Sequence, residues 1–147
     1  MRCAFCESPE IQERIILKNS LVSAFPTNIP ITPGHTLICP NRCIPKLSDL
    51  TADETLAIVE MVDIITAALK DAFGAKGFNF AWNEGETAGQ NVPHFHLHVV
   101  PRKSGDTGVT NYEPREFLYR PGSRKDTPET ELKEISRVIK ASLKKEL

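Results

Sequence analysis

Three of the chain's four histidines lie at alternate positions within residues 91–102, which read Asn-Val-Pro-His-Phe-His-Leu-His-Val-Val-Pro-Arg. Successive side chains of a β-strand point to opposite faces, so His94, His96 and His98 would share one face and the apolar residues between them the other. Using three imidazole rings only to fill a sheet is unfavourable, because each buried ring needs hydrogen-bond partners. The alternation therefore predicts a strand that packs through one face and carries out chemistry on the other.

Four further segments have the composition and alternation of β-strands. Residues 14–18 and 21–25 are separated by two turn-forming residues and are predicted to form an antiparallel hairpin. Residues 36–40 follow a proline-rich loop, and residues 77–83 alternate aromatic with small or polar side chains. The last of these is predicted to pair with the histidine strand across a short turn. The expected result is an antiparallel sheet of about five strands.

Two segments have the periodicity of amphipathic helices. The first begins after Thr51, whose spacing to Glu54 is that of a capping box, and ends at Phe73 before Gly74. Its apolar residues are predicted to form one packed face: Leu56, Ile58, Val59, Met61, Val62, Ile65 and Leu69. The second helix is predicted over residues 129–145. The whole pattern predicts an α+β fold in which one long helix packs on an antiparallel sheet.

The length of 147 residues fits a single domain over residues 1–147. We expect a core over about residues 1–105 and a C-terminal extension over 106–147 that contains the second helix. Residues 103–128 are polar and rich in glycine and proline. For this segment the sequence leaves open a cover over the substrate, a dimer arm or a mobile connection.

The charge of the chain is nearly balanced, with 18 basic and 19 acidic residues and a formal net charge of −1. This balance gives no general electrostatic attraction to duplex nucleic acid or to an anionic membrane. No apolar run approaches the roughly 20 residues that span a bilayer, and the N-terminus lacks the pattern of a secretory leader. A cytoplasmic location is expected, and an anionic ligand would have to be bound by local groups.

The segment between the last two predicted strands, residues 84–90, is suited to an anion. Gly89, Gln90 and Asn91 could present backbone N–H groups and side-chain amides to a phosphate, and glycine lets the backbone approach closely. Asn83, at the end of the preceding strand, would lie beside the histidines. Such a loop alone is more often an ordinary hairpin connection, and it is the neighbouring triad that favours a phosphate site.

The triad, His-φ-His-φ-His-φ-φ with φ apolar, resembles the defining motif of the histidine-triad (HIT) family. Residues 33–40, which begin Pro-Gly-His, are similar to the strand upstream of that family's site, and residues 83–90 are similar to its phosphate-facing loop. The similarity covers roughly residues 1–105 in the family's order. It looks closest to the fragile-histidine-triad branch, whose members hydrolyse dinucleoside polyphosphates.

The resemblance implies a nucleotide hydrolase or transferase that acts at the α-phosphate of a dinucleoside polyphosphate or a nucleoside phosphoramidate. It makes His96 the nucleophile, which would form a covalent nucleotidyl-imidazole. It makes His98 the residue that binds the same phosphate and assists the leaving group. Asn83, Gln90 and the backbone around Asn91 would hold phosphate and ribose, and an adenine nucleotide is the expected ligand.

The resemblance also suggests contacts for the rest of the nucleotide, with Phe5 and Leu37 near the base. The family usually has aspartate or asparagine eight residues before the histidine of Pro-Gly-His, where it binds ribose hydroxyls. That position is Thr27 in this chain, with Asn28 next to it, so these two residues are the candidates for the ribose contact. Family members usually pair into a homodimer with a continuous sheet, and a homodimer is expected here.

Four cysteines in a chain without an export signal favour reduced thiols or metal ligands over disulfides. Cys3 and Cys6 have the spacing of two zinc ligands. In relatives with this pair, a histidine three residues after the strand-ending proline and the first histidine of the triad complete the site. The corresponding residues here are Cys43 and His94, so a structural zinc is expected. The alternative is free cysteines with a mobile N-terminus, and Cys39 is interpreted as a buried apolar thiol.

Two other functions are compatible with the residues. His-x-His on a strand also chelates catalytic zinc in hydrolases and hydratases, in which case His35 would be the remaining histidine ligand. The chain could also be a non-enzymatic nucleotide-binding protein. A chelator series combined with a dinucleotide assay separates the first alternative, and single-turnover trapping of a covalent nucleotide separates the second.

Overall fold

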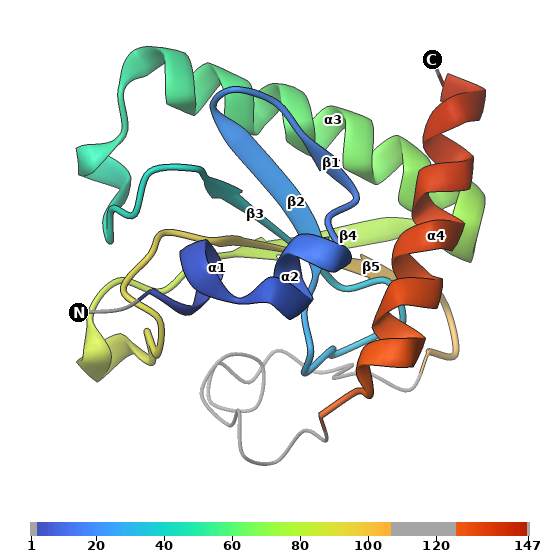
Figure 1. Ribbon diagram of the computed structural model, residues 1–147. Helices are drawn as coiled ribbons and strands as arrows, with labels where there is room; N and C mark the ends of the chain where they lie inside the picture. Colours follow the sequence, from blue (N-terminus) through green and yellow to red (C-terminus); the bar gives the residue numbers. More distant parts are fainter. Residues whose placement is uncertain (1–2, 107–125, 147) are drawn as a thin grey trace.

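A five-stranded antiparallel sheet is the centre of the computed structural model, which describes residues 3–106 and 126–146 (Figure 1). The strands, in spatial order, are β1 (Leu17–Lys18), β2 (Val22–Pro26), β3 (Thr36–Pro40), β5 (Leu97–Arg102) and β4 (Gly77–Ala81). The helices are α1 (Ala4–Glu7), α2 (Pro9–Glu13), α3 (Ala52–Phe73) and α4 (Glu129–Glu146), with 3-10 turns η1 (Leu47–Asp49) and η2 (Glu86–Ala88). The predicted α+β fold is confirmed.

The two faces of the sheet pack against different helices (Figure 1). Ile38 of β3 and Val99 of β5 belong to the core that the sheet forms with α3. Leu37 and Cys39 of β3 point the other way and cluster with Ile11 of α2. This alternation along β3 is the period of a strand buried on both sides. Cys39 is a buried thiol, as expected, and its burial raises its pKa to about 12.

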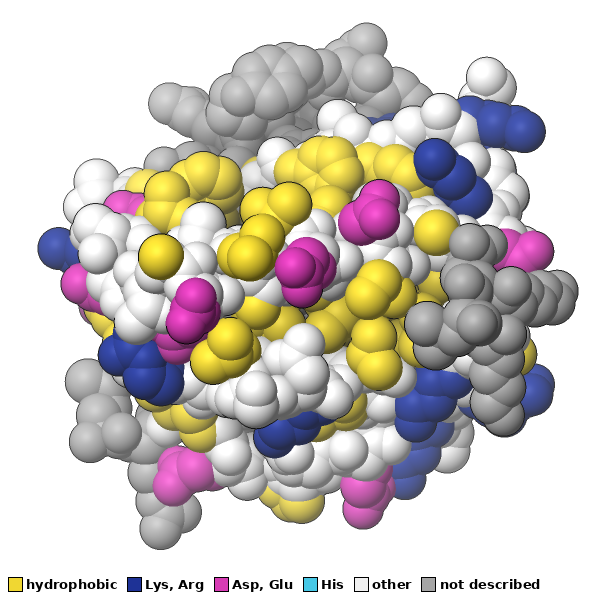
Figure 2. All heavy atoms as spheres, turned by 90° about the horizontal axis from the view of Figure 1, so that it is seen from above, with side chains coloured by type: hydrophobic (Ala, Val, Ile, Leu, Met, Phe, Trp, Pro, Cys, Tyr) yellow, Lys and Arg dark blue, Asp and Glu magenta, His cyan; other side chains and the backbone are white. Residues whose placement is uncertain are grey.

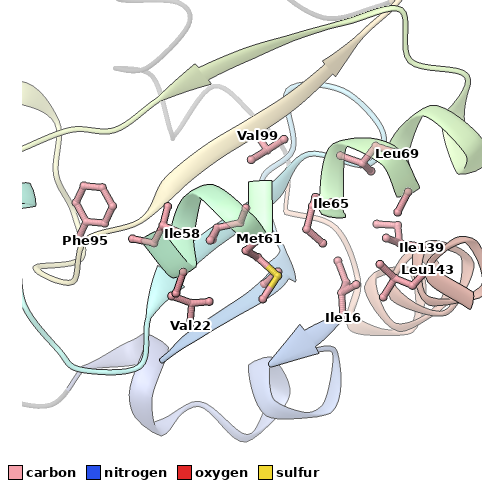
Figure 3. Packing of buried hydrophobic residues seen from close by; sticks show 14 residues of the cluster. Ile16, Val22, Ile58, Met61, Ile65, Leu69, Phe95, Val99, Ile139 and Leu143 are labelled. Atoms are coloured by element: carbon pink, nitrogen blue, oxygen red, sulfur yellow. The ribbon is translucent and has the colours of Figure 1, made fainter. Parts of the chain in front are cut away.

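The core between the sheet and α3 is mainly aliphatic, with Phe95 as a buried aromatic ring (Figure 3). Met61, Ile65 and Leu69 of α3 are buried at successive turns, and Ile139 and Leu143 extend the same cluster from α4. Burying each such side chain stabilises the fold by about 1.5–3 kcal/mol. The long helix is therefore fixed to the sheet along its length, and the sheet is a rigid support for the residues on its opposite face.

The prediction was wrong for two residues of the packed helix face. Leu56 and Val59 are 58% and 60% exposed, although they have helical spacing with the buried residues. The apolar arc of α3 is wider than the surface that the sheet and α4 cover, so its outer edge faces solvent. Phe80 on the edge strand β4 and Trp82 just after it are also largely exposed.

The N-terminal segment contains two short helices that the sequence analysis did not predict. The Ser8 hydroxyl accepts a hydrogen bond from the Ile11 N–H, and Pro9 occupies the first turn, so α2 has a standard capped start. The Arg14 N–H donates to the Ile11 carbonyl and ends the helix. β1 is therefore shorter than the predicted strand 14–18, although the N–H of Ile16 still donates to the Ala24 carbonyl of β2 at 2.8 Å.

The strands next to the histidines also differ in length from the prediction. β4 ends at Ala81 instead of Asn83, and β5 begins only at Leu97. Just before it, the chain turns: the His94 N–H donates to the Val92 carbonyl. His94 and His96 therefore precede the regular strand, while β3 and the start of α3 lie where the sequence predicted them.

The start of α3 is held by a capping box and an ion pair. Thr51 accepts from the Glu54 N–H, and the Glu54 carboxylate accepts from the Thr51 N–H. Both carboxylate oxygens of Glu54 also accept from the Arg42 guanidinium, at 2.9 and 2.8 Å. The hydrogen bonds from Arg42, followed by the one from Thr51, lower the pKa of Glu54 to about 2.

Replacing Arg42 with glutamine is expected to destabilise the protein at pH 7, because it leaves the buried Glu54 carboxylate without its charged partner. The effect is limited by solvent, which screens the half-exposed Arg42 side chain. A carboxyl with a lowered folded-state pKa stabilises the fold above its unfolded pKa near 4.5 and loses that contribution as the pH falls toward about 2. The difference between wild type and Arg42→Gln should therefore shrink across this pH range in urea unfolding. Arg137→Gln, which removes an exposed ion pair with Glu134, is the matched control. An equal effect of both substitutions at pH 7 would contradict the prediction.

Helix α4 confirms the helix predicted over residues 129–145 and packs against α3 and β2. The Glu129 carboxylate accepts from the buried Arg14 guanidinium at 2.8 Å, and Ser142 donates to Asp71 of α3 at 2.7 Å. Most of the polar segment predicted over residues 103–128 lies at 107–125, outside the described residues. Among the helices that the structure describes, none has the length and apolar character needed to cross a membrane.

Candidate functional site

The histidines gather on the side of the sheet away from α3. Figure 2 shows the α3 side, where hydrophobic and acidic side chains are visible and none of the four histidines is seen. His98 lies on β5 opposite Leu37 of β3 and Ala81 of β4. Its ring centroid is 5.2 Å from that of His96. The two residues predicted to be catalytic are therefore close enough to contact one ligand group.

His96 has a defined tautomer. Its Nδ1 lies 2.7 Å from the main-chain carbonyl oxygen of His94, and because that oxygen can only accept, Nδ1 must carry the proton. In the neutral ring Nε2 is then unprotonated and has the lone pair that a nucleophile needs. Burial of the ring lowers the pKa of His96, which favours this neutral form.

His98 has the opposite tautomer, fixed by two hydrogen bonds in series. The Ile31 N–H donates to Nδ1 of His35 at 3.0 Å, so this nitrogen is unprotonated and Nε2 of His35 carries the proton. That Nε2–H lies 2.9 Å from Nδ1 of His98 and donates to it. The proton of neutral His98 is therefore on Nε2. The two histidines offer one acceptor and one donor nitrogen, which is the pair required to attack and to stabilise a phosphoryl group.

The loop expected to bind phosphate is organised around Gln90. Its N–H donates to the Gly85 carbonyl, its Oε1 accepts from the Gly85 N–H at 2.8 Å, and its Nε2 donates to Pro45 at 3.0 Å. Gln90 is buried and holds the shape of the loop. Asn83 donates to the Gly89 carbonyl at 3.4 Å. Gly89 has a φ of 93°, a conformation that favours glycine.

The residues expected near ribose and base come from the segment after β2, from β3, from α1 and from the loop before His94. Thr27 is buried, its N–H donates to His35, and its hydroxyl accepts from Ile29. Asn28 follows it, and its carbonyl accepts from Thr127 at 2.7 Å. Asn91 is exposed at the end of the loop, Leu37 is buried beside His98, and Phe5 of α1 lies with its ring edge-on to His96 at 4.9 Å.

Three cysteines and one histidine meet at a second position. The candidate ligand atoms of Cys3, Cys6, Cys43 and His94 all lie within 4.8 Å of one another. Nδ1 of His94 is 3.2 Å from the Cys3 sulfur, while its Nε2 donates to the Pro40 carbonyl at 2.6 Å. The lone pair of Nδ1 therefore points toward the thiols. Three thiols and an imidazole oriented by a carbonyl are the donor set of a structural zinc site, so these residues could hold the ion.

The group of Cys3, Cys6, Cys43 and His94 is the one cluster of three or more possible ligands found within residues 3–106 and 126–146. His96, His98 and His35 do not form another. Nδ1 of His96 and Nδ1 of His98 are hydrogen-bonded to the His94 carbonyl and to His35, which leaves Nε2 of each ring to meet a ligand. A catalytic zinc on the His-x-His pair would need a third protein ligand, and the described residues form no group of three possible ligands at these two rings.

His35 is the residue whose role the sequence analysis did not identify. It was considered only as a possible metal ligand, whereas the structure places it behind His98, buried, as the donor that sets the tautomer of that ring. The Pro-Gly-His motif directly precedes β3, and β3 pairs with the histidine strand. Knowledge of that pairing would have shown that the two histidines meet across the strands.

Comparisons with known proteins give the same picture. The model of the HIT domain matches residues 8–105. The asymmetrical bis(5'-nucleosyl)-tetraphosphatase of Schizosaccharomyces pombe is 35% identical over 96 residues, which are 65% of this chain and 53% of that protein. The bis(5'-adenosyl)-triphosphatase of Dictyostelium discoideum is 36% identical over 95 residues, which are 65% of this chain and 64% of that protein. The chain thus spans between about half and two thirds of the length of these relatives.

A solved structure extends the similarity beyond the matched segment. The Zn-bound histidine triad family protein from Mycobacterium smegmatis superposes with a TM-score of 0.75 at 28% identity, over 99% of this chain and 95% of that one. The family model covers well over half of the chain, and the triad, the Pro-Gly-His strand and the glycine loop all lie within it. The chain belongs to the HIT domain family.

Proposed function

We propose that the protein is a nucleotide hydrolase or transferase that cleaves dinucleoside polyphosphates or nucleoside phosphoramidates at the α-phosphate, through a covalent intermediate on His96. The observation that carries this proposal is the pair of opposite tautomers, with an unprotonated Nε2 on His96 beside an Nε2–H on His98. The names of the two relatives, a tetraphosphatase and a triphosphatase, support the same reaction class. The second, a bis(5'-adenosyl)-triphosphatase, also supports an adenine nucleotide as substrate.

In the proposed first step, Nε2 of His96 attacks the α-phosphorus and the bond to the leaving group breaks. A leaving phosphate departs as an anion, and the Nε2–H of His98 stabilises it and the transferred group by hydrogen bonding. The amine of a phosphoramidate instead takes the Nε2 proton of His98 as its bond to phosphorus breaks, and His98 regains a proton from solvent. The His94 carbonyl keeps its hydrogen bond to Nδ1–H while the ring gains positive charge. Water then attacks the phosphorus, the P–N bond breaks, its electron pair returns to Nε2, and the proton of the water passes to solvent.

The remaining site residues are proposed to position the substrate. Asn83 and the backbone around Asn91 would contact the phosphate, and Gln90 would hold the shape of the loop. The N–H of Gly89 donates to the Glu86 carbonyl, so this glycine would contribute to the shape of the loop and not a donor to the phosphate. The ribose is assigned to Thr27 and Asn28, and the base to the aromatic ring of Phe5. Placing a phosphorus within reach of a fixed nucleophile can by itself supply about 7–11 kcal/mol of barrier reduction.

The proposal is tested by trapping the intermediate. Diadenosine triphosphate labelled at the α-phosphate, mixed with excess protein and quenched within milliseconds, should leave label on the protein, in an acid-labile and base-stable bond. His98→Ala should slow the formation of this adduct. Tight binding of the nucleotide without any adduct or product would instead identify a non-enzymatic binding protein. Turnover that stops with a chelator and never produces an adduct would identify metal-dependent hydrolysis.

We further propose that Cys3, Cys6, Cys43 and His94 hold a structural zinc. The support is the convergence of their ligand atoms and the Zn-bound relative from Mycobacterium smegmatis. When bound, the ion would supply charge neutralisation for the thiolates and join the N-terminus to the sheet. His96 and His98 are not among these ligands and stay available to the nucleotide.

A homodimer is proposed from exposed apolar side chains of α3 and of the edge strand β4. Leu56 and Val59 of α3 and Phe80 of β4 are all at least half exposed, and β4 ends the sheet. The hydrophobic side chains on this side of the molecule are visible in Figure 2. An open edge strand with apolar neighbours is a surface that a second copy can extend and cover.

The dimer is expected to dissociate when a charge is placed in this surface. Phe80→Glu should shift the protein from dimer to monomer in sedimentation at micromolar concentration, because a buried carboxylate without a partner is strongly unfavourable. Gln12→Glu, an equivalent charge on exposed α2 on the other side of the sheet, should leave the dimer intact. A wild-type monomer at micromolar concentration would contradict the prediction.

A further inference from the structure

The proposed metal site and the proposed nucleophile are joined by direct contacts. Phe5 lies between Cys3 and Cys6 in the sequence, and its ring meets the ring of His96 edge-on at 4.9 Å and that of His94 at 5.7 Å. The same ring also packs on Phe25 at 5.4 Å. The short segment that carries two of the thiols therefore also forms part of the wall around His96.

His94 connects the two sites a second time. Its Nδ1 faces the sulfurs of Cys3 and Cys6 at 3.2 and 3.5 Å, while its main-chain oxygen accepts the proton of His96 Nδ1 at 2.7 Å. The residue that completes the metal group is thus the residue that determines which nitrogen of His96 is unprotonated. A third connection involves Cys43: the Phe95 N–H donates to the carbonyl oxygen of Ile44, which follows Cys43, at 2.6 Å.

Helix α1 has little else to hold it in place. It contains four residues, has no side-chain cap, and buries none of its own residues. A helix of this length is unstable by itself, because it completes too few hydrogen bonds to offset the entropy of ordering it. Its position, and with it the position of the Phe5 ring, must depend on Cys3, Cys6 and the packing of Phe5 itself.

We infer that the metal-binding group of Cys3, Cys6, Cys43 and His94 positions the nucleophile. When these residues hold an ion, the His94 carbonyl and the Phe5 ring are fixed against His96. These two contacts keep Nε2 of His96 unprotonated and directed toward the substrate. In this arrangement His94 is a positioning residue, and Phe5, assigned above to the base, has a second role in positioning His96. Without the ion, α1 and the turn at His94 loosen, and the imidazole of His96 is free to rotate or to place its proton on Nε2. In that tautomer Nε2 carries the proton and has no lone pair with which to attack the phosphorus.

The inference rests on the zinc proposed above but is tested without any nucleotide. Two-bond ¹H–¹⁵N correlation spectra of ligand-free protein labelled with ¹⁵N-histidine distinguish protonated from unprotonated ring nitrogens. The signals that disappear in His96→Gln are those of His96. The zinc-loaded protein should show one unprotonated nitrogen, Nε2, for His96. After removal of the metal at the same pH, both nitrogens of His96 should move toward averaged shifts, while circular dichroism still reports a folded chain.

A variant separates the contact from the ion. Phe5→Leu keeps all four ligands and should retain one equivalent of zinc, yet show the same averaging at His96 in ligand-free protein and about a 10- to 100-fold loss in kcat. Any rise in KM reports separately on the contact of this ring with the base. Phe5→Tyr, which restores the ring, should recover most of the loss. Cys39→Ala, a buried thiol outside the ligand group, is the matched control and should change neither zinc content nor the His96 signals.

Three results would overturn the inference. These are an unchanged His96 tautomer in folded metal-free protein, unchanged signals and kcat in Phe5→Leu, and the absence of bound zinc from the purified protein. If the metal-free chain unfolds, the zinc-loaded Phe5→Leu variant decides the question. A protein that shows the tautomer change but turns over no nucleotide would retain the positioning and refute only the proposed reaction, so the two failures are distinguishable.

Discussion

His96→Ala is expected to lower kcat for diadenosine triphosphate by at least about 10⁴-fold, because removal of a covalent nucleophile leaves only substrate positioning and charge stabilisation. The change in stability should be small. The substitution frees the His94 carbonyl from its hydrogen bond, which costs about 1 kcal/mol. Initial rates and thermal unfolding on the same preparations test both statements. Near-normal turnover by the variant would exclude His96 as the nucleophile.

His96→Gly gives a sharper form of the same test. Glycine leaves an imidazole-sized space on the sheet face next to His98, and free imidazole added to the buffer can occupy it. Turnover that rises with imidazole concentration in His96→Gly, but not in His98→Ala, would assign the nucleophilic nitrogen to the missing ring. Cys39→Ala, from the neighbouring strand β3, should keep wild-type turnover and have no response to imidazole. Rescue of both histidine variants to the same extent would argue against distinct roles for the two rings.

Local patterns were sufficient for most of the fold. The capping box at Thr51 and the glycine after Phe73 gave the limits of α3, and the apolar run 36–40 coincides with β3. What failed depended on distant partners. Leu56 and Val59 match the helical period as well as Ile65 does, and only the width of the sheet under α3 decides which of them is covered. The two N-terminal helices were missed because a helix of four or five residues is too short to show a helical repeat of apolar residues in the sequence.

In the candidate site, too, some residues were predictable from local sequence and others depended on distant partners. Alternation in one segment predicted that His94, His96 and His98 share one face, because residues two apart on a strand point the same way. The choice of His96 and His98 as the catalytic pair came from the resemblance to the histidine-triad family. The role of His35 required the pairing of β3 with β5, which brings together residues that are 63 positions apart. The cluster of cysteines with His94 joins segments 91 residues apart, and no local pattern contains it. It was expected only through the resemblance to a known family.

Removal of the zinc is expected to have the second-largest effect, on stability. Elemental analysis after expression in zinc-supplemented medium should find about one equivalent per chain, and Cys43→Ala should lose it, because three ligands no longer close a tetrahedral site. The ion binds the folded chain, so at 100 to 1,000 times its dissociation constant it adds about 2.7–4.1 kcal/mol to the free energy of unfolding. For a chain of this length that corresponds to a decrease in Tm of roughly 6–15 °C.

The loss of stability on removal of zinc should be largest near the N-terminus. The chain keeps an aliphatic core that does not include the ligands, so the metal-free protein should remain folded over the sheet and α3 while the backbone of α1 and α2 loses its protection from hydrogen exchange. Cys39→Ala also removes a buried thiol and should cost only about 1 kcal/mol through a small cavity, with full zinc content. An unchanged metal content in Cys43→Ala, or equal exchange at the N-terminus with and without the ion, would mean that these four residues do not hold a structural metal.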